Sequence, residues 1–273
     1  MSDGSSSLAY WNKAESHLQN EHRRRVDPQF DNYLCQVAGF SIQLLDELDR
    51  NATQNQKEIE LIKGLLPFFL DSAKVLAVIS REMSLITTSN QARHLFEVFL
   101  IVKFIFKSGN VQQYADLYRK FAVVNQLRAH NKGLAPMLSP EELATFRASY
   151  PFWFNGDGTV KGKRKAHWTN TTGITSIETL ATHVGETNLY TEFYHVGSGV
   201  AHGSPEIWRL FIDPIKMGID PIAGKVPVYK FALCSSYFLM MISELFGDYF
   251  VTNYSKEELA FLRSEHTRLS NLL

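Results

Sequence analysis

The sequence predicts an all-α protein, a single multi-helix bundle domain of about ten helices with two irregular loop segments. Apolar residues recur at three- and four-residue spacing along nearly the whole chain, which is typical of helices that bury one face. Alternating runs typical of strands are scarce, and the clearest exception is a short stretch around Val226 to Tyr229. Explicit helix-start signals add a third observation in favour of this class.

Three four-residue segments carry these start signals. Ser139 is a suitable N-cap, Pro140 fits the first helical position, and Glu142 completes the spacing of a capping box. The segments Ser255–Glu258 and Thr175–Glu178 repeat the same spacing. We therefore expect helices to begin at all three places.

Periodicity and these starts divide the chain into segments. The expected helices, with boundary errors of roughly two to four residues, span residues 8–24, 29–50, 55–86, 89–107, 111–132, 140–149, 174–184, 188–202, 229–251 and 256–271. Pro67 should break or kink the third. The irregular segments are 151–172 and 205–227. We expect a helical extension at residues 1–27, followed by one helical domain at 28–273.

Composition bounds the function classes. The 273 residues are 45% hydrophobic, which is enough for a large core. Lys plus Arg and Asp plus Glu number 28 each, so no global field attracts nucleic acid or an anionic membrane. Cys35 and Cys234 stand far apart in apolar surroundings, as expected for reduced thiols in the cytoplasm. The N-terminus resembles no secretory signal, and charged or polar residues interrupt the apolar runs, so we expect no membrane span.

Arg93 and Glu97 are inserted into an otherwise apolar helix. At 100° per residue they share one stripe with Leu100 and Phe104, and we expect them to form a partly buried ion pair. One interpretation, which we favour, is that the pair fixes helix register. The other is that Glu97 holds the guanidinium of Arg93 toward a phosphate or carboxylate.

A second set of polar residues recurs every four positions. Tyr190, Tyr194, Ser198 and His202 would lie along one drifting stripe of a helix, with His195 beside them as a further candidate ligand contact. His202 could simply cap the helix C-terminus. Because histidine is well suited to proton transfer near neutral pH, it could equally be catalytic. The residues leave both interpretations open.

The motifs of common cofactor sites are missing. The sequence has no phosphate-binding loop, no dinucleotide-binding glycine turn, no His-Glu-x-x-His and no Cys-x-x-Cys, so we expect neither a cofactor nor a metal. A short basic run that includes Lys163 and Arg164 precedes His167 and Trp168. Cations beside a stacking surface would suit single-stranded nucleic acid, although a solvated loop is the simpler interpretation.

The order of these features resembles the bacterial domain of unknown function DUF5677 over residues 69–210. The matching positions are Arg93, Glu97, Tyr114, Tyr118, Trp168, Tyr194, Ser198 and His202. This resemblance implies a helical fold and no activity. The chain is more distantly similar to HEPN (higher eukaryotes and prokaryotes nucleotide-binding) proteins, helical dimers that include toxin and antiphage ribonucleases.

The HEPN resemblance would put Ser198 at the polar position of the family's motif and His202 at its catalytic histidine. Gly197 stands where that motif has an arginine, and Arg93 from another helix could supply the missing cation. The resemblance implies a homodimer that acts on RNA.

Three hypotheses follow. In the first, the protein is a metal-independent ribonuclease or toxin-type effector of bacterial stress or phage defence, in which His202 transfers a proton, Arg93 stabilises the phosphorane, and Tyr194 and Ser198 position the phosphate. In the second, it is a non-catalytic binding or regulatory module for an anionic ligand, nucleic acid or an operon-encoded partner, with Arg93, the tyrosines and Trp168 as contacts. In the third, these polar groups only specify the fold.

Overall fold

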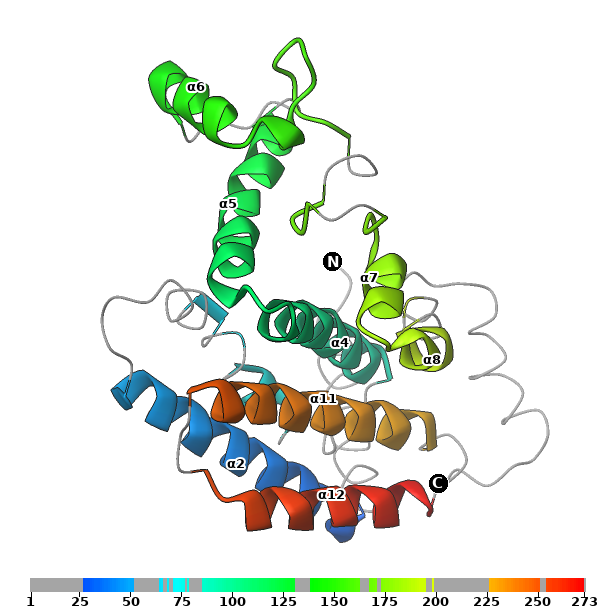
Figure 1. Cartoon of the computed structure of the whole chain (residues 1–273). Coiled ribbons are helices and arrows are strands. Elements are labelled where there is room, and N and C mark those ends of the chain that lie inside the picture. The colour runs from blue at the N-terminus through cyan, green and yellow to red at the C-terminus, as the bar shows by residue number, and fades with distance from the viewer. Residues whose placement is uncertain are drawn as a thin grey trace, which may run out of the picture. The chain divides into compact units, whose positions relative to one another are not determined.

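A computed structural model describes residues 27–51, 64–65, 68, 71–76, 78, 85–130, 138–162, 167–170, 173–194, 198, 226–250 and 254–272 (Figure 1). These residues are mainly helical, and the strand-type pairing among them is limited to an isolated bridge between Phe154 and Val160. The predicted all-α class is therefore confirmed. None of the described helices has both the length and the hydrophobicity needed to cross a membrane.

The described helices follow the predicted order. They are α2 (Pro28–Asn51), α4 (Leu85–Lys107), α5 (Val111–His130), α6 (Pro140–Ser149), α7 (Ile177–His183), α8 (Thr187–Leu189), α11 (Val226–Phe250) and α12 (Lys256–Ser270). A 3-10 turn, η1 (Pro151–Trp153), follows α6, and a π-helical turn, η2 (Tyr190–Tyr194), follows α8. The predicted helix at 8–24 and the kink at Pro67 lie outside the described residues.

The chain divides into two compact units. The first unit comprises Met1–Leu48, Phe68–Phe96 and Phe193–Leu273, and the second comprises Asp49–Pro67 and Glu97–Glu192. The boundary between them falls within α4. The predicted division into an extension at 1–27 and a domain at 28–273 stays a prediction.

The first unit is built around α2, α11 and α12, which lie side by side in Figure 1. Hydroxyl groups link the buried faces of these helices. Ser236 donates a hydrogen bond to the hydroxyl of Tyr33 (3.2 Å), which lies 3.2 Å from Nδ1 of His266, and Ser243 donates to Ser41 (3.2 Å). Burial raises the pKa of Tyr33 and lowers that of His266, so the tyrosine stays protonated and the neutral imidazole is favoured.

The second unit has its own core around α5, α6 and η1. Leu117, Val124, Trp153 and Phe154 are buried there, and partly buried rings pack around them. None of the ten residues of α6 is buried. This helix is therefore held mainly by partly buried side chains such as Phe146, whose ring stacks on that of Trp153 with 6.0 Å between centroids.

Two of the predicted helix starts are confirmed at their predicted residues. Ser139 accepts a hydrogen bond from the backbone of Glu142 (3.2 Å), and Oε2 of Glu142 accepts one from the backbone of Ser139 (2.8 Å). Ser255 caps α12 by accepting a bond from the backbone of Glu258 (3.0 Å). Each serine satisfies an amide that the helix leaves without an internal partner.

The third predicted start is shifted by one residue. Ser176, rather than Thr175, is the N-cap of α7, and it accepts a hydrogen bond from the backbone of Thr179 (3.2 Å). The hydroxyl of Thr179 accepts a bond from the backbone of Ser176 (3.0 Å) in return. The assignment was wrong because threonine at the third position can do what a glutamate does in the usual capping box.

Two other predictions are corrected in α4 and α11. The helix expected at residues 89–107 begins earlier, because α4 starts at Leu85, and the Ser89 hydroxyl donates to the carbonyl of Ile86 (3.1 Å) inside the helix. The strand-like stretch Val226–Tyr229 forms the first turn of α11, where a proline costs no hydrogen bond. A serine can stand at the start of a helix or inside one, and a run of β-branched and aromatic residues can form a strand or a helix. The local pattern therefore did not settle either case.

Cys35 and Cys234 form no disulfide, as predicted. Both are partly buried, and burial raises the pKa of Cys234 to about 12. A thiol with such a pKa is almost entirely protonated at neutral pH, so Cys234 is a poor nucleophile.

Gly247 lies in α11 against the side chain of Tyr254. A Cβ atom at Gly247 would overlap the Tyr254 ring. That ring is held in place because its hydroxyl donates to Asp248 (2.6 Å) and because it packs against Phe40, with 6.4 Å between ring centroids. The absence of a side chain at Gly247 therefore allows the ring of Tyr254 to pack closely against α11.

We expect Gly247→Ala to lower the free energy of unfolding by about 1 kcal/mol, because the steric overlap outweighs the preference of helices for alanine. Gly39 in α2 is the matched control, since a Cβ there would meet nothing within 4 Å. Gly39→Ala should raise the free energy of unfolding by roughly 0.5–1 kcal/mol. Parallel urea unfolding of both variants measures the difference, and stabilisation by both would contradict the packing of Tyr254.

Candidate functional site

Two of the predicted site residues meet in the first unit. The guanidinium of Arg93, on the first half of α4, lies over the ring of Tyr194 at 5.2 Å from its centroid. Tyr194 is 9% exposed and also packs against the fully buried Phe96, with 5.6 Å between centroids. A cation over an aromatic face is a favourable contact. This contact gives Arg93 a structural role in addition to any role in binding.

Glu97 lies one helical turn after Arg93 and belongs to the second unit. Burial and the negative charge of Glu97 together raise the pKa of Tyr118 on α5. Glu97 is therefore electrostatically coupled to a residue that was part of the same family resemblance. The predicted ion pair between Arg93 and Glu97 stays a prediction.

The four-residue stripe from Tyr190 to His202 does not start in a regular α-helix. Tyr190 and Tyr194 are the first and last residues of the π-helical turn η2. A step of four residues is slightly less than one turn of a π-helix and slightly more than one turn of an α-helix, so the offset between these two side chains is reversed in sense. Ser198 is helical and partly buried. His195, His202, Lys163 and Arg164 lie outside the described residues.

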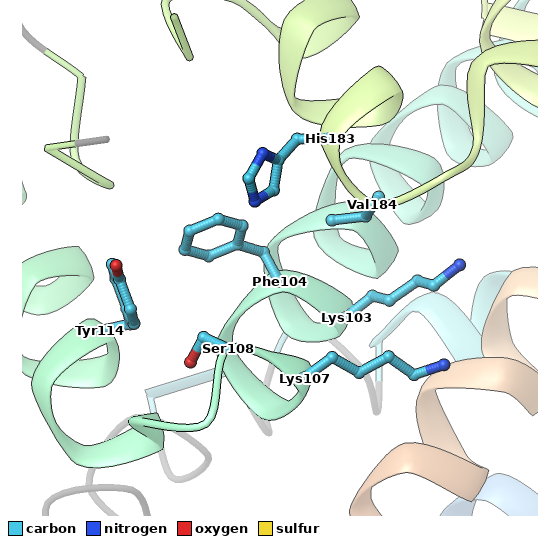
Figure 2. Close-up of a pocket in the computed structure, with 7 residues that line it drawn as sticks. All are labelled: Lys103, Phe104, Lys107, Ser108, Tyr114, His183 and Val184. Carbon is cyan, nitrogen blue, oxygen red and sulfur yellow. The ribbon is translucent and has the colours of Figure 1, made fainter. Parts of the chain in front are cut away.

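A pocket of about 350 Å³ opens in the second unit. The end of α4 and the residue after it, the start of α5 and the end of α7 line it, with Lys103, Phe104, Lys107, Ser108, Tyr114, His183 and Val184 (Figure 2). In Figure 2 the two lysine side chains extend in the same direction, away from Tyr114, while His183 reaches from α7 toward the ring of Phe104. The pocket therefore has a cationic side and an aromatic side.

Phe104 is the centre of the aromatic side. It is 4% exposed, and its ring contacts Tyr114 edge-on with 4.8 Å between centroids and His183 at 5.4 Å. Trp168 packs against Phe104 with 5.3 Å between centroids and against Tyr118 with 5.2 Å. Trp168 is buried, so in this conformation it supports Phe104 instead of contacting solvent.

The two lysines on the cationic side differ in their surroundings. Lys103 is only 14% exposed in its side chain, forms a short ion pair with Glu186, and lies over the ring of Phe99 at 5.6 Å. Its charge is thus balanced inside the protein. Lys107 is exposed in the last turn of α4, and within the described parts of the chain it has no ion-pair partner. Lys107 leaves this side of the pocket with a net positive charge.

Polar groups beside the aromatic rings could orient a ligand. The Ser108 hydroxyl donates to the carbonyl of Ile105 (2.8 Å) and accepts a bond from the backbone of Asn110 (3.2 Å), so it helps to end α4. The hydroxyl of Tyr114 has no hydrogen-bond partner among the described residues. The exposed imidazole of His183 can donate or accept. The pocket can therefore combine ring contacts with hydrogen bonds.

The described residues contain no group of three or more His, Cys, Asp or Glu side chains that could hold a metal ion. The pocket offers aromatic rings, hydroxyls, an imidazole and an ammonium group. The hydroxyl of Ser108 is engaged with the end of α4, so it is not poised as a nucleophile.

Sequence patterns indicated Trp168 and the family position Tyr114, but they did not indicate Lys107, His183 or the role of Phe104 as a pocket wall. One signal was available. Lys103 and Lys107 are four residues apart in an otherwise apolar segment, so they share one face of a helix. Ser108 and Gly109 directly follow Lys107, which places this face at the end of the helix. The contribution of His183 depends on how α7 packs, which no local pattern encodes.

A family model described as a family of unknown function (DUF5677) matches residues 46–214, more than half of the chain. The predicted resemblance is therefore confirmed, and the match extends beyond residues 69–210 at both ends. No curated protein and no solved structure matches the chain. The more distant resemblance to HEPN proteins gains no support from these findings and stays a prediction.

Proposed function

The chain belongs to the family of unknown function DUF5677, and for this member we propose a non-catalytic binding function in which the pocket of the second unit holds an anionic ligand with a planar ring. The observation that carries the proposal is one pocket with Lys107 on one side and Phe104, Tyr114 and His183 on the other. A ring could stack on the aromatic side while an anionic group approaches Lys107.

The size and charge of the pocket favour a nucleoside monophosphate among such ligands. Its volume of about 350 Å³ is at the lower end of small-molecule sites, which span roughly 300–1,000 Å³. Lys103 and Glu186 cancel one another, so Lys107 supplies the excess charge. A single excess ammonium suits one phosphate better than a triphosphate, which would bring unbalanced negative charge.

Calorimetric titration with adenosine monophosphate, adenosine and inorganic phosphate tests this proposal. We expect the monophosphate to bind more tightly than either of its parts, because only the intact ligand reaches both sides of the pocket. Binding of phosphate alone with equal affinity would contradict the aromatic contact. No binding of any nucleoside monophosphate would contradict the proposal as a whole.

Lys107→Glu should weaken binding of adenosine monophosphate by about tenfold or more, because it replaces the attracting charge by a repelling one. Lys120→Glu is the matched control, since it makes the same charge change on α5 at a residue that does not line the pocket. Equal affinities for the two variants would show that only net charge matters. His183→Ala tests the aromatic side in the same titration.

The ribonuclease hypothesis stays a prediction beside this proposal. In its favour, Arg93 and Tyr194 are in contact, but the proposed proton-transfer residue, His202, lies outside the described residues. Incubating the purified chain with total RNA, beside a His202→Ala variant, tests the hypothesis. Cleavage that depends on His202 would replace the binding proposal by a catalytic one. If neither protein cleaves RNA, the ribonuclease hypothesis is wrong.

A further inference from the structure

Helix α12 of the first unit buries one face and exposes two large apolar side chains on another. Leu259, Leu262 and Leu269 are at most 3% exposed and face the core. Phe261 and Leu272, in contrast, are 52% and 60% exposed. Single apolar side chains are common at protein surfaces. These two are distinguished by the pattern that they share with their neighbours on the helix.

The two exposed residues belong to one stripe that also contains an ion pair. At 100° per residue Phe261, Glu265, Arg268 and Leu272 fall within about 60° of one another. Leu272 follows the helix in a tighter, 3-10-type turn, in which its backbone donates to the carbonyl of Leu269 (3.1 Å). The stripe therefore runs from an apolar residue through two opposite charges to another apolar residue.

The order of residues along this stripe is complementary to itself. The intervals between its members are four, three and four residues, so the pattern has the same spacing in both directions. When two copies of α12 lie antiparallel about a two-fold axis between Glu265 and Arg268, Phe261 of each copy faces Leu272 of the other. In the same arrangement Glu265 of each copy faces Arg268 of the other.

We propose that the stripe of Phe261, Glu265, Arg268 and Leu272 on α12 is a two-fold interface between two copies of this chain. Such an interface needs a patch that is complementary to itself, and here apolar groups meet apolar groups while opposite charges meet at the axis.

The ion pair at the centre is already well formed in one copy. Arg268 donates from Nε and Nη2 to the carboxylate of Glu265, the shortest distance being 2.9 Å, and from Nη1 to Oε1 of Gln29 (3.0 Å). These contacts hold both charged groups in place before association. Two such pairs side by side form a square of alternating charges, in which each charge has an opposite neighbour in both copies.

The limited size of the stripe sets the strength of the association. One helix face from each copy covers less than the roughly 1,200 Å² that stable complexes bury as a minimum. The dimer is therefore weak and dependent on concentration. Sedimentation equilibrium of the full chain over a wide concentration range measures it, and a wild-type chain that stays monomeric throughout overturns the proposal.

Single charge reversals in the stripe give the decisive test. In Glu265→Arg the axis carries only positive charges, and in Arg268→Glu only negative ones, so each variant alone should dimerise at least about tenfold more weakly than the wild type. An equimolar mixture of the two variants places a doubly positive stripe against a doubly negative one. We expect this mixture to form heterodimers with at least the wild-type affinity.

Each variant lacks the ion pair within its own chain, both alone and in the mixture. Tighter association in the mixture must therefore come from contacts between the two chains. Circular dichroism confirms that both variants keep their helix content. Phe261→Asp, which leaves Glu265 and Arg268 unchanged, should weaken dimerisation as well. Variants that dimerise like the wild type, or a mixture no tighter than its components, place any self-association on another surface and overturn the proposal.

Discussion

Trp153→Ala is expected to lower the free energy of unfolding by about 3–5 kcal/mol, the largest effect of any substitution considered for this protein. Trp153 is 1% exposed, and its ring lies 5.0 Å from that of Tyr150 and 5.4 Å from that of Phe121, measured between centroids. Its removal leaves a cavity in the core of the second unit. It also removes the Nε1 donor of a 3.1 Å hydrogen bond, which leaves the carbonyl of His167 without that partner.

Trp153→Phe separates the two effects. Phenylalanine keeps much of the ring volume and loses the donor, so we expect a smaller loss of about 1–2 kcal/mol. Urea unfolding followed by circular dichroism compares both variants with the wild type. Because the chain has two compact units, the transition should also be followed by a second probe to show whether it is a single step. A loss below 1 kcal/mol for Trp153→Ala would contradict the packing of this core.

The stability of the protein is expected to fall as the pH decreases from 6.5 toward 4, because His167 is held in its neutral form. Burial lowers the pKa of His167 to about 4. Its Nδ1 accepts a hydrogen bond from the backbone of Thr169 at 3.5 Å, which a protonated Nδ1 could not do. Folding therefore stabilises the neutral ring. This contribution is fully present above the unfolded pKa of about 6.5 and is lost as the pH falls through the folded pKa.

The full pKa difference corresponds to about 3 kcal/mol at 1.36 kcal/mol per unit, and since the ring is partly exposed we expect roughly 2 kcal/mol. The His167→Gln side chain keeps a hydrogen-bond acceptor but does not titrate. Between pH 6.5 and 4 the free energy of unfolding should therefore fall less in this variant than in the wild type, by about this amount. Denaturant unfolding at several pH values measures the difference. His266→Gln is a useful second variant, because burial lowers the pKa of His266 in the same direction. Parallel pH profiles for the wild type and His167→Gln would contradict this assignment.

Local sequence signals predicted the elements whose boundaries are set by short-range hydrogen bonds. The cap at Ser139 is an example, because serine, proline and glutamate at fixed spacing satisfy the first amides of α6 regardless of what packs against it. Ser89 shows the limit of such signals. A serine hydroxyl can cap the start of a helix or donate to a carbonyl inside one. Ser89 does the latter, in a position that tertiary packing buries completely.

The candidate site was less predictable than the fold. Tyr190 and Tyr194 were assigned to an α-helix, but they belong to a π-helical turn, and periodicity cannot detect a local change of helix type. Phe104 was assigned to the same stripe as Arg93 and Glu97 for packing, and the structure gives it a second role as a pocket wall. Its neighbours Tyr114 and His183 come from other helices, so only the folded chain brings them together.

The position of Trp168 behind Phe104 provides the pocket with an intrinsic optical reporter. Indole emission responds to changes in its surroundings, and the Trp168 ring contacts the side chain that a ligand would touch. The chain contains three further tryptophans, whose emission overlaps that of Trp168. Fluorescence of Trp168→Phe against the wild type would isolate this signal. Occupancy of the pocket could then be followed in real time without a label.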